Sequence, residues 1–172
     1  MSILKIYQYP EPVLRQKGKK IDVFSPELKT LIEDMADTMY DAPGIGLAAP
    51  QVGESLQLLI VDTTTDKDNK KYMVVINPEI TATEGSQIDE EGCLSVPDLT
   101  ANVKRFKKIH LTYQDADGKT HEIVAEDRFA VVLQHEIDHL NGILFIDHLT
   151  PLKRNLYKKK MKKLLSSSKV TA

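Results

Sequence analysis

In its last quarter the chain reads His135-Glu136-Ile137-Asp138-His139, which places two histidines one helical turn apart. Residues at i and i+4 lie on one face of an α-helix, so both imidazoles can reach the same metal ion. Glu136 projects about 100° around the helix from His135, where a carboxylate can act as a base beside the metal. An apolar run at 129–133 precedes the motif, and unpaired imidazoles would be costly to bury there. We therefore expect a central helix over about 127–141 that binds a metal.

The third metal ligand decides which class of site this helix belongs to. Metal proteases with this motif add a third histidine soon after it, but that position is Phe145 here. Others use a glutamate from a later helix. However, no Asp or Glu follows Asp147, which lies too close to His139 to belong to a separate helix. The missing ligand must therefore lie upstream.

Cys93 is the natural candidate for that ligand, and it is the only cysteine in the chain. It lies in the polar, glycine-containing segment Glu90-Glu91-Gly92-Cys93-Leu94-Ser95, whereas a structural cysteine is usually placed in an apolar run. Two histidines and one cysteine leave a fourth coordination position open for water, as catalytic zinc sites do. On spacing alone, a free thiol remains the alternative.

A glycine-rich segment upstream, Gly44-Ile45-Gly46-Leu47-Ala48-Ala49, matches the dinucleotide-binding fingerprint literally. That fingerprint must follow a strand and open a helix, but here a helix precedes the segment and a strand follows it. The segment is therefore either a tight turn or a loop whose glycines let the backbone approach a substrate closely.

Hydrophobic periodicity and turn residues predict the remaining elements. Ser25-Pro26 begins a helix, Asp117-Gly118 turns a hairpin, Asp127 is a candidate helix cap with Gly142 as the helix stop, and Thr150-Pro151 begins a basic helix. We expect helices at 25–40, 127–141 and 150–165, strands at 56–63, 72–77, 108–114 and 119–125, and a polar turn at 66–71. Helices among antiparallel strands make an α+β fold, and the length of 172 residues suits one domain.

Three motifs in register resemble the peptide deformylase family. They are Gly44-Ile45-Gly46-Leu47-Ala48-Ala49-Pro50-Gln51, Glu91-Gly92-Cys93-Leu94-Ser95 and Gln134-His135-Glu136-Ile137-Asp138-His139. Their order and separations look like those of the family, and the likeness runs from Tyr9 to Leu152, nearly the whole chain. The resemblance implies an α+β fold in which antiparallel strands surround the metal-binding helix. It implies one catalytic domain over 1–172, with a basic C-terminal helix or tail at about 150–172.

The resemblance also implies a reaction and a site. The reaction is hydrolysis of the formyl group from the N-terminal formyl-methionine of newly made polypeptides, which releases formate. A ferrous ion, replaceable by zinc, nickel or cobalt, is assigned to Cys93, His135 and His139. Glu136 is implied as the base and then acid of the reaction, and Gln51 and the backbone N–H of Leu94 as oxyanion donors. The expected substrate contacts are Ile45, Gly46, Glu91, Arg105, Val131 and Val132.

One position departs from the family pattern. Many relatives have leucine where this chain has Arg128, at the border of the methionine side-chain pocket. We expect the long Arg128 side chain to extend to solvent.

Two other functions could use the same histidine helix. A zinc peptidase would need an open cleft on both sides of an internal peptide bond. A structural metal domain would fill all four coordination positions with protein ligands, and Glu136 beside the histidines argues against that.

Charge is distributed unevenly along the chain. The net charge of −2 argues against a protein that coats nucleic acid over its whole surface, and we expect neither DNA nor a membrane as a partner. The segment 150–172 nevertheless contains no acid and eight basic residues: Lys153, Arg154, Lys158, Lys159, Lys160, Lys162, Lys163 and Lys169. This segment is either a solubilising helix packed on the domain or a contact to the ribosome, which the family resemblance favours.

The location expected from the sequence is the cytoplasm. A lone cysteine fits a reducing compartment. The N-terminus lacks the apolar run that a signal peptide needs, and no apolar run is long enough to span a bilayer.

Overall fold

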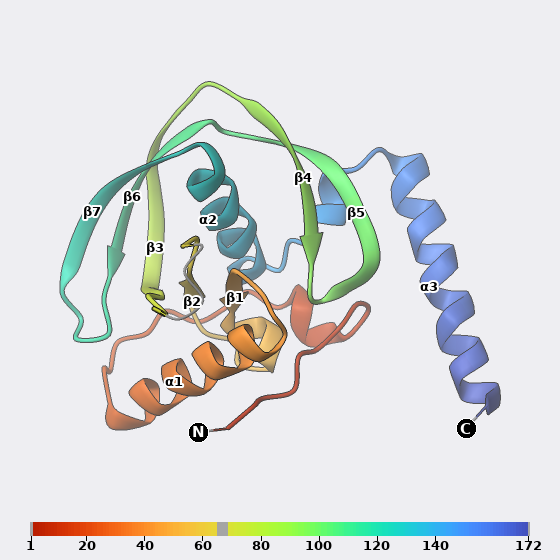
Figure 1. Cartoon of the computed structure of the whole chain (residues 1–172), viewed down its shortest axis with the longest axis horizontal. Coiled ribbons are helices and arrows are strands. Elements are labelled where there is room, and N and C mark those ends of the chain that lie inside the picture. The colour runs from red at the N-terminus through yellow and green to blue at the C-terminus, as the bar shows by residue number, and fades with distance from the viewer. Residues whose placement is uncertain (1, 65–68, 172) are drawn as a thin grey trace.

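The computed structural model describes residues 2–64 and 69–171, with side chains described as far as Leu164 in the last helix. The fold is α+β, as expected, and the described residues form two antiparallel sheets, three α-helices and three short 3-10 helices (Figure 1). The five-stranded sheet has the order β1 (Gly46–Ala48), β2 (Leu58–Val61), β3 (Met73–Glu84), β6 (Lys108–Gln114) and β7 (Thr120–Glu126). The second sheet is the hairpin of β4 (Gln87–Cys93) and β5 (Val96–Arg105). The helices are α1 (Pro26–Asp41), α2 (Asp127–Leu140) and α3 (Pro151–Thr171), and the 3-10 helices are η1 (Pro12–Arg15), η2 (Ala49–Val52) and η3 (Phe145–His148).

Helix α2 lies between the large sheet and the β4–β5 hairpin, where strands surround it (Figure 1). On the sheet side, Ala130, Leu133 and Leu140 are buried in one core with Leu59 and apolar residues of β3 and β6. The hairpin side of α2 carries the histidine motif. The expectation of a central helix among antiparallel strands is therefore confirmed.

Strand β2 is buried on both of its faces because a helix covers each side of the sheet. Leu59 and Val61 face the core that contains α2, whereas Leu58 and Ile60 face the core formed with α1. The side chains of a strand alternate between its faces, which explains why this strand reads as a continuous apolar run.

The predicted boundaries of α1 are confirmed. Ser25 caps the helix, because its Oγ accepts a hydrogen bond from the backbone N–H of Leu28 at 3.2 Å. The start of α2 was predicted one residue too late: its N-cap is Glu126, and Asp127 is its first residue, with φ of 55°. Asp127 instead donates its backbone N–H to the carbonyl of Lys107. Gly142, with φ of 75°, follows the end of α2 as predicted.

The β4–β5 hairpin was not predicted from the sequence, and its residues explain why. Strand β4 reverses the usual pattern, since Ile88 is 70% exposed and Glu91 only 6% exposed. Its inward residues are polar because they contact polar groups of α2 rather than an apolar core. Strand β3 is also longer than predicted, and the expected turn at 66–71 lies partly outside the described residues.

Helix α3 lies at the edge of the molecule, next to the β4–β5 hairpin (Figure 1). Tyr157 and Met161 bury their side chains in a core with Val96 and Phe145, which attaches the helix to the domain. Leu152 and Leu156 are exposed, so the apolar residues of this segment do not all face the domain. Within the described residues, no helix is long and apolar enough to cross a membrane.

Candidate metal centre

Cys93, His135 and His139 come together between the end of β4 and the hairpin side of α2. One possible ligand atom from each lies within 4.8 Å of those of the other two. His139 Nε2 is 3.3 Å from Cys93 Sγ, and both histidines are buried. The i and i+4 spacing places the imidazoles side by side, while the fold brings the thiol from 42 residues upstream of His135 (135 − 93).

Glu91 orients the first of these histidines. Its Oε1 accepts a hydrogen bond from His135 Nδ1 at 2.9 Å, which leaves Nε2 directed towards the site. Arg105 donates to both oxygens of Glu91, from Nε and Nη2, at 2.8 Å each. Burial tends to raise the pKa of Glu91, but the hydrogen bonds from Arg105 and His135 outweigh it and lower the pKa to about 2. Glu91 is therefore a carboxylate that fixes the tautomer of His135.

A chain of polar contacts continues from Arg105 to the surface. Arg105 Nη1 donates to Asp138 Oδ2 at 2.6 Å, and His148 Nε2 lies 2.9 Å from the same oxygen. The sequence predicted Arg105 as a substrate contact, but the structure places its guanidinium behind Glu91 and outside the lining of the main cavity. Arg105 therefore supports Glu91 rather than facing the cavity.

Glu136 lies beside the three candidate ligands without joining them. Its Oε1 is 4.0 Å from His135 Nε2, and its Oε2 has no hydrogen-bond partner among the described residues. Burial, with a further contribution from the charge of Glu91, raises the pKa of Glu136 to about 7. A Cβ added to Gly46 would lie 2.8 Å from Glu136 Oε1, so glycine is needed there to make room for this carboxylate.

Gln51 reaches the site from η2 with a fixed orientation. Its Oε1 accepts from the backbone N–H of Ala48 at 2.9 Å, so its Nε2 is directed towards Ser95 Oγ at 3.0 Å and Cys93 Sγ at 3.6 Å. An amide N–H directed to the cysteine side of the centre can donate to an oxygen bound there.

A cavity of about 630 Å³ opens beside this cluster. Its lining includes most of the residues predicted from the sequence: Ile45, Gly46, Gln51, Glu91, Cys93, Leu94, Val131, Val132, His135 and Glu136. Val131 and Val132 form an apolar wall on α2. Arg128 also lines the cavity, and its side chain is 66% exposed, in line with the expectation that it extends to solvent.

The surroundings of the two histidines shift their pKa values in opposite directions. Burial tends to lower the pKa of His135, but hydrogen bonds with Cys93 and Glu91 outweigh it and raise the pKa to about 10. Burial, together with the positive charges of His135, Arg105 and Arg15, holds the pKa of His139 well below its usual range. A thiol and two imidazoles are a donor set of a catalytic metal site, and the unpartnered Glu136 Oε2 lies beside them, so these described residues fit a divalent ion.

Comparison with known proteins identifies the family. The family model described as polypeptide deformylase matches residues 3–155. The chain belongs to the polypeptide deformylase family. It is 65% identical over 164 residues to the peptide deformylase of Desulfotalea psychrophila, covering 95% of this chain and 97% of that protein. It is 49% identical over 162 residues to the peptide deformylase of Thermodesulfovibrio yellowstonii, covering 94% and 98%.

Solved deformylase structures have the same fold. A peptide deformylase from Legionella pneumophila superimposes with a TM-score of 0.89 at 47% identity, covering 97% of this chain and 98% of that one. A complex of the Synechococcus elongatus peptide deformylase with actinonin gives a TM-score of 0.87 at 38% identity, covering 92% and 88%. The chain is accordingly a metal-dependent hydrolase that removes formyl groups from nascent peptides.

Proposed function

We propose that Cys93, His135 and His139 hold one divalent metal and that Glu136 moves the proton during hydrolysis of formyl-methionyl peptides. The observation that carries this proposal is the convergence of a thiol and two imidazoles at one wall of the cavity, beside a buried carboxylate. When bound, the metal supplies Lewis acidity and lowers the pKa of water towards neutrality.

In this mechanism Glu136 carries the proton, and Gln51 and Leu94 stabilise the negative charge that develops. Glu136 accepts a proton from the attacking water and later donates it to the departing α-amine. This role is supported by the position of Glu136 beside the candidate ligands and by its burial, which raises the pKa of the carboxyl above its usual range. Gln51 Nε2 and the backbone N–H of Leu94 donate to the oxygen on which negative charge develops. One such donor typically stabilises the transition state by about 3 kcal/mol.

The substrate in this proposal lies along the cavity. Its methionine side chain packs against Ile45, Val131 and Val132, and Gly46 offers its backbone to the peptide. Glu91 belongs to the site through His135, and Arg105 acts through Glu91. We propose a ferrous ion in the cell, as the family resemblance implies. Zinc, nickel or cobalt can replace it, because a thiolate with imidazoles suits all four metals.

Product analysis on one peptide tests this function against the peptidase alternative. The protein, purified without oxygen and loaded with ferrous ion, is incubated with formyl-Met-Ala-Ser, and formate and peptide masses are measured. The expected products are equal amounts of formate and Met-Ala-Ser. Cleavage of an internal peptide bond without formate would support a peptidase and contradict the proposal.

We also propose a cytoplasmic location and a contact between α3 and the ribosome. The substrate is a nascent chain, and a metal-binding thiol must stay reduced. The side chains of Lys158, Lys159, Lys162 and Lys163 are exposed on α3, where they can meet RNA phosphates. Tyr157 and Met161 anchor the same helix to the domain, so deleting the segment would expose a core. Substitution of the lysines is therefore the better test.

Replacing Lys158, Lys159, Lys162 and Lys163 together with glutamine should weaken ribosome co-sedimentation at low salt and spare turnover of short formyl-peptides. The slope of log affinity against log salt should become shallower by about 0.7 to 0.9 for each lysine that pairs with a phosphate in the wild type. The control variant carries glutamine at Lys17, Lys19, Lys20 and Lys29, which belong to other parts of the domain. Equal weakening of binding in both variants, or no salt-sensitive binding by the wild type, would leave α3 with a structural role only.

A further inference from the structure

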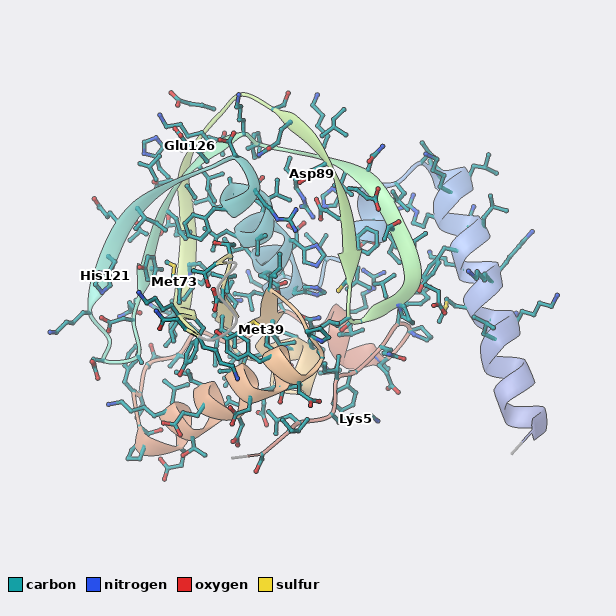
Figure 2. All side chains as sticks on the ribbon, viewed as in Figure 1. Lys5, Met39, Met73, Asp89, His121 and Glu126 are labelled. Atoms are coloured by element: carbon teal, nitrogen blue, oxygen red, sulfur yellow. The ribbon has the colours of Figure 1, made fainter. Side chains whose placement is uncertain are left out.

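The inward face of β4 is joined to α2 by a polar contact at every second residue. Gln87 Nε2 donates to the carbonyl of Asp127 at 2.9 Å, and Glu91 accepts from His135 at 2.9 Å. Between them, Asp89 Oδ2 lies 3.6 Å from Arg128 Nη1. Figure 2 shows Asp89 beside β4, near the N-terminal part of α2. The ion pair of Asp89 and Arg128 therefore connects the strand to the helix at the edge of the cavity.

Arg128 belongs to the same side of α2 as the apolar wall of the cavity. Arg128, Val131, Val132 and His135 follow one another at i, i+3, i+4 and i+7, and all four line the cavity. Arg128 lies one turn nearer the helix N-terminus than the two valines, about 5 Å along the axis. The β4–β5 hairpin contributes Glu90 and Asp98 to the lining, both acidic and exposed. Among the described lining residues, Arg128 is the one with a permanent positive charge.

The guanidinium of Arg128 is free to bind a further acid. Its side chain is 66% exposed, and its contact with the 39%-exposed Asp89 involves one nitrogen at 3.6 Å. Arginine has five N–H donors in a planar fork that fits a carboxylate with two parallel hydrogen bonds. A carboxylate that arrives from the cavity can therefore pair with Arg128 in better geometry than Asp89 does.

An extended substrate would bring its third residue to this position. This step rests on the proposed function, in which the formyl group lies at the metal and the methionine packs on Val131 and Val132. In an extended peptide, residues i and i+2 point to the same side and stand about 6.7 Å apart. This spacing is similar to one turn of α2. We propose that Arg128 makes the enzyme select substrates with an acidic side chain at the third residue.

Matched peptides and variants test this selectivity. Formate release is measured for two pairs of peptides that differ only in aspartate or asparagine. Formyl-Met-Ala-Asp-Ser and formyl-Met-Ala-Asn-Ser test the third position, and formyl-Met-Asp-Ala-Ser and formyl-Met-Asn-Ala-Ser test the second. The wild type should favour aspartate over asparagine about three- to fivefold in kcat/KM at the third position only, through KM, as expected for an exposed ion pair. The preference should shrink as salt rises and screens the charges.

Substitutions of Arg128 and of Asp89 should change the preference for aspartate in opposite directions. Arg128→Gln should abolish the preference for aspartate, and Arg128→Lys should keep part of it. Asp89→Asn should strengthen the preference, because the competing carboxylate is gone. Lys29→Gln removes one positive charge from α1, where Lys29 pairs with Asp117, and should leave the ratio unchanged.

Each possible outcome decides a separate claim. Formate release with equal rates for the aspartate and asparagine peptides would overturn the role of Arg128, and so would a ratio that Arg128→Gln does not change. A preference at the second position instead of the third would overturn the predicted pose. No formate from any of the peptides would contradict the proposed function rather than this inference.

Discussion

Replacing Glu136 with glutamine is expected to remove nearly all turnover while the protein keeps its metal. Glu136 lies beside the three candidate ligands, and its Oε2 has no partner among the described residues. In the proposed mechanism this carboxylate carries the proton and does not bind the metal. Glutamine has nearly the same shape but cannot accept and return a proton. General acid–base catalysis typically contributes about 100- to 10,000-fold, and a loss of kcat in this range is expected.

The measurement pairs formate release with metal content determined on the same sample. Glu122→Gln is a matched control, because it removes the same charge from an exposed position on β7, away from the site. Wild-type activity in Glu136→Gln would rule out Glu136 as the proton carrier. Loss of metal from that variant would instead make Glu136 a ligand.

Replacing Cys93 with alanine is expected to weaken metal binding more than any substitution outside the ligand set. Removing a group that only orients a ligand usually reduces metal affinity about 10- to 100-fold, so removal of the thiolate itself should have a larger effect. Competition with a chelator gives the affinity without reference to activity. Ser95→Ala is the control, since Ser95 contacts Cys93 Sγ through its backbone N–H and keeps that contact. A Cys93→Ala protein that holds metal as tightly as the wild type would exclude Cys93.

Oxidation gives a second measurement of the same residue. In the ferrous enzyme both the iron and the Cys93 thiolate are oxidisable, so peroxide should release metal and inactivate the protein. The zinc form, whose metal is not redox-active, should lose activity only as the thiolate itself reacts.

The parts of the fold that follow local rules could be predicted from the sequence. Ser25 and Pro26 begin α1 where the capping rule places it, and Asp117-Gly118 turns the β6–β7 hairpin with Gly118 at φ of 84°. The β4–β5 hairpin could not be predicted, because its exposed Ile88 and buried Glu91 contradict the usual meaning of an alternating pattern. Glu91 is buried only because Arg105 and His135 compensate its charge, and both partners come from other elements.

The candidate site also has a part that could be predicted from the sequence and a part that could not. The histidine pair is visible in the sequence, because two residues at i and i+4 share a helix face whatever the rest of the fold does. The support from Arg105 to Glu91 was missed, since the β4–β5 register pairs Arg105 with Gln87 rather than with Glu91, and the two side chains meet only in the folded structure. The signal that the sequence did offer is the acid two residues before Cys93, because an acid so close to a candidate ligand can orient another ligand. Asp89 and Arg128 likewise meet only once β4 lies against α2.

The most direct test of the metal centre is X-ray absorption at the metal edge of the wild-type protein loaded with zinc. The proposed ligand set predicts one sulfur at about 2.3 Å and two imidazole nitrogens at about 2.0 to 2.1 Å, with one further light atom from water. The sulfur should disappear from the spectrum of Cys93→Ala. A wild-type spectrum without sulfur, or one in which protein ligands fill all four positions, would contradict a catalytic centre built from Cys93, His135 and His139.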